Sequence, residues 1–164
     1  MLFRSDGFLY VAGFQIAGWG NTLSTLAGLE RVRYTGAPLL TPREVVPTDR
    51  GILLRFEVAL DPKLATDPDN YALASWHYKR AHTYGSAQYK ADGKTGNDYL
   101  TASSVLLSAD GKSVFVAVPG LRPVEQLRIG WTIAAADGTR MSSNAYTTPY
   151  ELTKFDPEIG RAHV

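Results

Sequence analysis

The stretch of residues 51–60, GILLRFEVAL, decides the fold class of this chain. Every second position of the stretch is apolar, and these positions are Ile52, Leu54, Phe56, Val58 and Leu60. The positions between them include the charged residues Arg55 and Glu57. Side chains two residues apart lie on the same face of an extended strand. The stretch therefore predicts a strand with one face in a core and the other face mostly in water.

Further strands are predicted downstream of this stretch. Residues 104–118, SVLLSADGKSVFVAV, predict a hairpin because two β-rich runs flank an Asp-Gly pair, whose glycine supplies a positive φ. Residues 126–139, QLRIGWTIAAADGT, predict another strand that ends at a second Asp-Gly turn. Residues 144–152, NAYTTPYEL, predict an edge strand, because Pro149 cannot donate a hydrogen bond to a neighbouring strand.

The spacing of these strands indicates an all-β protein. We expect roughly seven strands at the spacing of about 8–12 residues that is typical of antiparallel sandwiches. No long segment has the period of about 3.6 residues that an amphipathic helix shows. We therefore predict an Ig-like antiparallel β-sandwich over residues 41–152. A β-hairpin appendage over residues 1–40 precedes it, and a flexible tail over residues 153–164 follows it.

Composition narrows the classes of function. The chain has 164 residues, of which 45% are hydrophobic, and its 17 basic residues nearly balance its 16 acidic ones. A nucleic-acid binder or a polybasic membrane anchor needs a marked basic excess, so we expect neither nucleic acid nor a membrane as partner. The absence of cysteine excludes a disulfide, a thiolate zinc site and a covalently attached haem within these residues. The apolar segment 8–20 is interrupted by Gln15 and lacks a clear cleavage site, so we expect no signal peptide there.

Two parts of the chain resemble known families. DGFLYVAGFQIAGWG (6–20) and GLERVRYTGAP (28–38) resemble the closing blade of secreted β-propellers of the sorbosone or glucose dehydrogenase type. LLRFEVALDP (53–62) and DPDNYALASWHYKRAHTYGS (67–86) resemble the domain appended after such propellers, in large proteins that often also carry a c-type cytochrome module. The F-x-x-x-LDP…NY portion is also similar to the Ig-like modules of surface-layer proteins. Together these resemblances cover about residues 6–150.

The resemblance implies a context rather than an activity. It implies an extracellular or periplasmic parent protein, of which this chain is a C-terminal fragment. The catalytic residues of a propeller dehydrogenase lie in other blades, so none is carried over to this chain. A two-strand remnant of a blade cannot bury its apolar side alone. We therefore expect residues 8–34 to pack on the sandwich or on the rest of the parent propeller, or to pair with a second copy.

The most aromatic stretch, NYALASWHYKRAHTYGSAQYK at residues 70–90, supplies the candidate binding site. On a strand, Trp76 and Tyr78 share a face with small alanines and offer rings on which a sugar can stack. Alternatively, one face of this strand is core and the other is merely amphipathic. Tyr84 and Tyr89 follow in a predicted loop, with Arg80 as a polar partner. The predicted ligand-binding residues are therefore Trp76, Tyr78, Arg80, Tyr84, Tyr89 and, in the Gly-rich loop of the N-terminal part, Trp19.

Other motifs are too incomplete to indicate a metal or a reaction. His77 and His82 are separated by an odd number of positions and so point to opposite faces of a continuous strand. TDPDNY (66–71) supplies three side chains with oxygen ligands where Ca²⁺ needs about six or more oxygens, and turn formation explains the same residues. ADGKTGND (91–98) lacks the first glycine of a phosphate loop. We expect no metal, no cofactor and no catalytic residue, because neither a G-x-S-x-G elbow nor a distinctive pair of acids occurs.

These observations favour a non-catalytic accessory or interaction module of a secreted multidomain protein. Carbohydrate binding through the aromatic loop is the specific hypothesis. One alternative is a purely structural domain. The other is a fragment of a propeller-type sugar oxidoreductase that has no complete active site of its own.

Overall fold

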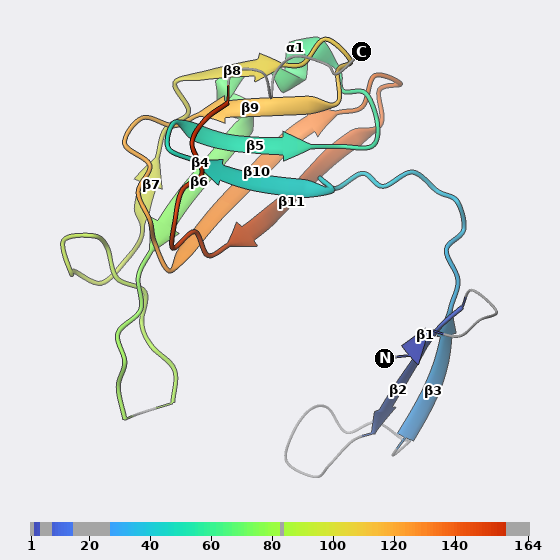
Figure 1. The fold of residues 1–164 in the computed structure, drawn as a ribbon, viewed down its shortest axis with the longest axis horizontal. Coiled ribbons are helices and arrows are strands. Elements are labelled where there is room, and N and C mark those ends of the chain that lie inside the picture. Colours follow the sequence, from blue (N-terminus) through green and yellow to red (C-terminus); the bar gives the residue numbers. More distant parts are fainter. Residues whose placement is uncertain (1, 4–7, 15–26, 83, 157–164) are drawn as a thin grey trace. The chain divides into compact units, whose positions relative to one another are not determined.

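The computed structural model describes residues 2–3, 8–14, 27–82 and 84–156 (Figure 1). The chain divides into two compact units, Met1–Ala37 and Pro38–Val164. Every sheet in the described residues is antiparallel, which confirms the predicted all-β class.

The smaller unit is a three-stranded sheet in the order β1-β2-β3. Its strands are β1 (Leu2–Phe3), β2 (Leu9–Phe14) and β3 (Ala27–Val32). The predicted hairpin corresponds to β2 and β3, whose register runs from Leu9 opposite Val32 to Phe14 opposite Ala27. Leu29 and Val32 are exposed in this unit, with 71% and 49% of their surface open. Taken by itself, this small sheet does not cover these apolar side chains.

The larger unit contains eight strands and two single-turn helices. The helices are α1 (Pro62–Ala65) and the 3₁₀ turn η1 (Pro68–Asn70). The strands are β4 (Glu44–Thr48), β5 (Gly51–Arg55), β6 (Tyr71–Trp76), β7 (Asp98–Leu100), β8 (Ser104–Leu107), β9 (Ser113–Ala117), β10 (Gln126–Ala134) and β11 (Arg140–Thr147).

The eight strands form two four-stranded sheets, which pack face to face (Figure 1). One sheet has the order β4-β5-β9-β8 and the other the order β11-β10-β6-β7. In chain order these are the ABED and C′CFG sheets of an immunoglobulin sandwich, so the topology agrees with the predicted fold. The two Asp-Gly pairs turn the β8–β9 and β10–β11 hairpins as predicted, with Gly111 and Gly138 at φ of 70° and 86°.

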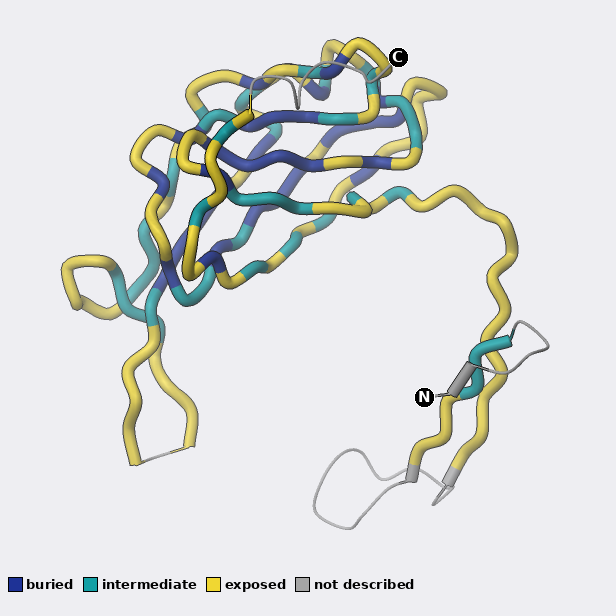
Figure 2. Tube along the Cα trace, viewed as in Figure 1, coloured by how far each residue is buried: buried dark blue, intermediate teal, exposed yellow. Residues whose placement is uncertain are grey.

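The core consists of the inward side chains of both sheets. Figure 2 shows that the buried residues are concentrated on the strands of these two sheets. Period-two alternation produces this core, since Ile52 and Leu54 of β5 point inward while Arg55 is exposed. The following residues share this arrangement and have no exposed surface: Ile52, Leu54, Val114, Val116, Val118, Leu127 and Ile129. Burying each such side chain contributes on the order of 1.5–3 kcal/mol. Among the described residues, no helix is long and apolar enough to cross a bilayer.

The outward face of β5 is less exposed to solvent than its sequence predicts. Leu53 points away from the core, yet only 1% of it is exposed. It lies opposite Phe115 of β9, whose ring is 4.4 Å from the ring of Phe155. The segment before Phe155 pairs with β4, because the Asp49 N–H donates to the Thr153 carbonyl at 2.9 Å. The first residues of the predicted tail thus cover this sheet, whereas residues 157–164 lie outside the described part.

At Gly51, whose φ is 157°, the backbone lies close to the adjacent strand. A Cβ at this position would lie 2.2 Å from the Val116 carbonyl oxygen and 3.0 Å from a ring atom of Phe115. Because the first neighbour is backbone of the adjacent strand, the sheet itself must move to admit any side chain.

Gly51→Ala should therefore lower the free energy of unfolding by about 2–3 kcal/mol or more, measured by chemical denaturation. Gly120→Ala is the matched control: its φ is also positive, at 75°, but nothing lies within 4 Å of an added Cβ. That control should lose only about 1 kcal/mol, the strain of a left-handed backbone. Equal small losses in the two variants would contradict the close approach.

Candidate functional site

The longest connection in the larger unit is the β6–β7 loop, residues 77–97, which carries most of the predicted binding residues. It extends away from the two sheets, and its distal part is exposed (Figures 1 and 2). Loops held by a rigid sandwich are common sites of binding. The β6–β7 loop is therefore the first candidate site.

Backbone hydrogen bonds close the base of the loop. The His77 N–H donates to the Tyr89 carbonyl at 2.7 Å, and the Tyr89 N–H donates back to the His77 carbonyl at 2.9 Å. Tyr89 also bridges to Thr95, and the Gly96 N–H donates to the Gln88 carbonyl at 2.9 Å. The base is thus a short ladder, and it supports a distal arch between residues 78 and 88.

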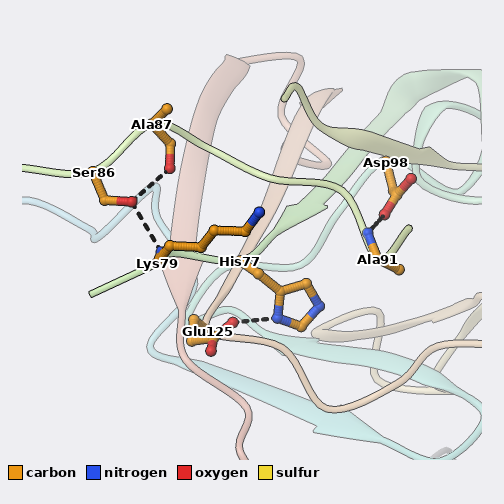
Figure 3. Close-up of polar contacts among 7 residues, drawn as sticks. All are labelled: His77, Lys79, Ser86, Ala87, Ala91, Asp98 and Glu125. Carbon is orange, nitrogen blue, oxygen red and sulfur yellow. Dashed lines mark hydrogen bonds and ion pairs between the residues drawn. The ribbon is translucent and has the colours of Figure 1, made fainter. Parts of the chain in front are cut away.

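Side chains reinforce this base (Figure 3). The Nδ1 atom of His77 contacts a carboxylate oxygen of Glu125. The register that pairs Trp76 with Gln126 explains this contact, because it places the next residue of each strand opposite the other. The Asp98 carboxylate accepts a hydrogen bond from the Ala91 N–H at 2.8 Å, which fixes the return of the chain into β7.

Lys79 joins the two arms of the loop. Its N–H donates to the Ser86 hydroxyl oxygen at 3.0 Å, and that hydroxyl donates to the Ala87 carbonyl at 2.8 Å. Its ammonium lies 4.1 Å from the centroid of the Tyr89 ring and donates to the Gly93 carbonyl at 3.2 Å. The cation–π contact occupies one face of Tyr89.

A pocket of about 500 Å³ lies beside the base of the loop. It is bounded by the end of β6, by β7 and by the segment 120–124. Its lining combines ionisable and apolar residues: Ser75, His77, Ala91, Asp98, Tyr99, Leu100, Gly120, Leu121, Arg122, Pro123 and Val124. A pocket of this size with a few polar groups suits a small polar ligand or one unit of a polymer.

The structure brings four of the six predicted residues together on one loop. Tyr78 and Arg80 are exposed, Tyr84 is fully exposed at 100%, and Tyr89 is half-buried beneath Lys79. Trp19 lies outside the described residues.

Trp76 is buried on strand β6, unlike the four predicted residues that lie on the β6–β7 loop. Its side chain is only 5% exposed and lies on the outward face of β6, with its ring edge-on to that of Tyr146 at 6.4 Å. The ring of Trp76 is therefore packed against the sheet rather than open on one face. The predicted sharing of a strand face by Trp76 and Tyr78 does not produce a joint platform, because β6 ends at Trp76.

The residues considered for metals are engaged locally. Among the described residues, no group of three or more His, Cys, Asp or Glu side chains is placed to hold a metal ion. Asp61 accepts from the Leu64 N–H at 2.8 Å and Asp67 from the Asp69 N–H at 3.0 Å, so both cap single-turn helices. Asp92 accepts from the Lys94 N–H at 2.9 Å, which makes ADGKTGND a turn.

A second pocket, of about 870 Å³, lies at the end of the β4-β5-β9 face. Its two arginines lie near acids, since Arg55 is 3.2 Å from Glu44 and Arg43 is 4.0 Å from Glu57. The pKa of Asp110 in this pocket is lowered, first by the hydrogen bond from the Ser108 hydroxyl and then by that from the Lys112 N–H. These bonds shape the β8–β9 turn, so a structural role accounts for this pocket.

Comparisons with known proteins found two similar solved chains. No protein-family model matches the chain, and no curated protein matches it. It is similar to the structure of surface layer protein SbsC, domains 1–6, at 15% identity and a TM-score of 0.46, over 65% of this chain and 13% of that one. It is also similar to the crystal structure of the S-layer protein rSbsC(31–844), at 16% identity and a TM-score of 0.46, over 66% of this chain and 13% of that one.

Both structural neighbours are surface-layer proteins. The likeness to propeller dehydrogenases stays a prediction. The chain spans only 13% of the length of either neighbour.

The contact between His77 and Glu125 should hold the loop base closed. In Glu125→Ala we expect the amide hydrogens of His77 and Tyr89 to exchange a few-fold faster, because a partly exposed side-chain contact contributes up to about 1 kcal/mol. Exchange measured by NMR tests this. Glu44→Ala, which removes an ion pair on the other sheet, should leave both amides unchanged. Unchanged exchange in Glu125→Ala would contradict the bracing role.

Proposed function

We propose that the larger unit is a non-catalytic binding module of a larger cell-surface or secreted protein, and that it binds carbohydrate through the β6–β7 loop. The observation that carries this proposal is the loop itself: an arch with exposed tyrosines on a base fixed by backbone pairing. The backbone pairing at the base limits the conformational freedom that the loop loses when an exposed ring stacks on a sugar face.

The chemistry of the loop suits a neutral or acidic sugar. Tyr78 and Tyr84 offer ring faces, and Arg80 and His82 beside them offer hydrogen-bond donors. The adjacent pocket adds Asp98 and further polar groups. Flat rings with flanking donors match the apolar face and the peripheral hydroxyls of a pyranose.

Binding rather than catalysis is favoured by the state of the acids near the pockets. Asp98 accepts from the Ala91 N–H, Glu125 contacts His77, and Asp110 accepts from Ser108. Glu44 and Glu57 are close to arginines. Each of these acids has a structural partner, whereas glycoside hydrolysis needs two acids facing a shared sugar.

The smaller unit supports the proposed link to a parent protein. Val11 and Val32 lie on one face of its sheet and Leu29 on the other, as the register of β2 and β3 requires, and all three are exposed. In a propeller, neighbouring blades cover both faces of each sheet. Exposed apolar residues on both faces are therefore what a blade separated from its neighbours would show.

The glycan proposal is tested by isothermal titration with neutral and acidic polysaccharides. Tyr84→Ala and Tyr78→Ala should each weaken binding by about tenfold, since truncating an aromatic contact commonly costs more than 1 kcal/mol. Tyr150→Ala, which removes an exposed tyrosine beyond β11, is the control and should bind as the natural chain does. A natural chain that binds none of these polymers, or loop variants with undiminished affinity, would refute the proposal.

The blade proposal is tested by light scattering. The natural chain should self-associate as its concentration rises, and Leu29→Lys should weaken that association by placing a charge on the uncovered face. Leu106→Lys, at a 58% exposed leucine of β8, is the control and should not change it. A chain that remains monomeric at every concentration would argue against an uncovered blade face.

A further inference from the structure

The outward face of the sheet β11-β10-β6-β7 carries aromatic and basic residues that the proposed function does not use. The register places Tyr146 opposite Arg128, Arg128 opposite Ala74, and Ala74 opposite Tyr99. Residues directly opposite one another in neighbouring strands point to the same face. These four residues therefore form one row across the whole sheet, which we call the tyrosine–arginine row.

The row has an exposed ring at each end. Tyr99 is 78% exposed and Tyr146 is 60% exposed. Three strand-to-strand steps separate them, so their Cα atoms are about 15 Å apart. Ala74 has no exposed surface although it points outward, so its larger neighbours close over it. The two tyrosines thus stand at either end of a filled ridge.

The guanidinium group of Arg128 makes no hydrogen bond or ion pair with a described residue, and its Nε is buried without a hydrogen-bond partner. The same holds for the Nε1 of Trp76, on the same face. A buried donor left unpaired is costly and rare in native proteins. These two atoms lie beneath the surface of the ridge. The terminal nitrogens of Arg128 do not share this burial, and Arg128 is half-buried as a residue, so they are the donors that a ligand's oxygen atoms can reach.

On the side of the ridge away from Trp76, the neighbouring rows are low and polar. A Cβ on Gly130 would lie 2.6 Å from Oδ1 of Asn144, so the Asn144 amide lies over the glycine and forms a shelf. One row further, the hydroxyls of Thr132 and Ser142 are 3.3 Å apart and exposed. Amide and hydroxyl groups along a shelf can exchange hydrogen bonds with the hydroxyls of a sugar chain.

The charge of this face has one sign. The outward residues of its four strands include Arg128 and Arg140, and none of them is acidic. Arg140 likewise has no ion pair with a described residue. It lies three rows from Arg128, about 20 Å along the strands. Two unpaired guanidinium groups at that distance complement a polymer with repeated negative charges better than a single anion.

We propose that this outward face binds an anionic polysaccharide, with the sugar rings stacked on Tyr99 and Tyr146 and an acidic substituent held by Arg128. The guanidinium fork matches a carboxylate or a sulfate, so the shared chemistry is an oxyanion carried on a sugar chain. The proposal shares its ligand class with the β6–β7 loop but uses none of the loop tyrosines, so either surface can fail while the other stands.

The test is a titration of the natural chain with polygalacturonate, dextran sulfate and neutral dextran. Binding is measured by calorimetry and by NMR of the backbone amides. We expect binding of polygalacturonate or dextran sulfate and no binding of neutral dextran through this face. Arg128→Gln should weaken binding at least tenfold, and Tyr99→Ala and Tyr146→Ala about tenfold each. Arg128→Lys should recover only part of the loss, because lysine keeps the charge and loses the fork. The preferred polymer tells carboxylate from sulfate.

Matched variants separate binding at this face from binding elsewhere on the molecule. Arg50→Gln, at an exposed arginine between β4 and β5, is the control and should bind as the natural chain does. An unchanged thermal melting temperature shows that each variant is folded. Amide shifts should appear at residues 128–132 and 142–146. Shifts confined to residues 77–97, or affinity lost in Tyr84→Ala but kept in Arg128→Gln, would overturn this inference and leave the loop proposal standing. Equal loss in Arg50→Gln, or a dimer that Arg128→Gln dissociates, would also overturn it.

Discussion

The closure of two sheets over one apolar interior is the constraint on which the rest of this structure depends. Each inward side chain of β5, β9 and β10 is excluded from water by residues of the opposite sheet. This burial is the dominant favourable contribution to folding, and it fixes the register of every strand, since a slip of one residue would expose an entire row. The ends of the strands are fixed in consequence, and so are the points from which the loops emerge.

Period-two patterns made the sheets predictable, whereas contacts between distant segments did not follow from sequence. Ile52 and Leu54 could be assigned to a core because the alternation is local. Leu53 lies opposite Phe115, which packs against Phe155, and Trp76 packs against Tyr146. These neighbours are identified only once the strand order is known. The sequence therefore predicts an exposed outward face for β5, but that face is covered in the structure. It likewise predicts an exposed ring for Trp76, but that ring is buried.

The two candidate binding surfaces also differ in how far they can be recognised from local sequence. The tyrosines of the β6–β7 loop stand out in sequence because they cluster within a short segment. Glu125, which contacts His77, lies 48 residues away from it and becomes visible only through the register of β6 and β10. The tyrosine–arginine row is drawn from four separate strands. Sequence spacing therefore identifies sites carried by one loop and misses sites assembled across a sheet.

The pairing of Thr153 with β4 has a mechanical consequence. The two segments run parallel, with Thr153 opposite Thr48, and are joined by hydrogen bonds from the Asp49 N–H to Thr153, from Thr153 to the Pro47 carbonyl, and from the Phe155 N–H to the Asp49 carboxylate. Tension that pulls the chain before β4 away from the chain after Phe155 loads these bonds in shear, so they must rupture together rather than unzip in turn. Such a clamp resists force through the height of the unfolding barrier, independently of equilibrium stability.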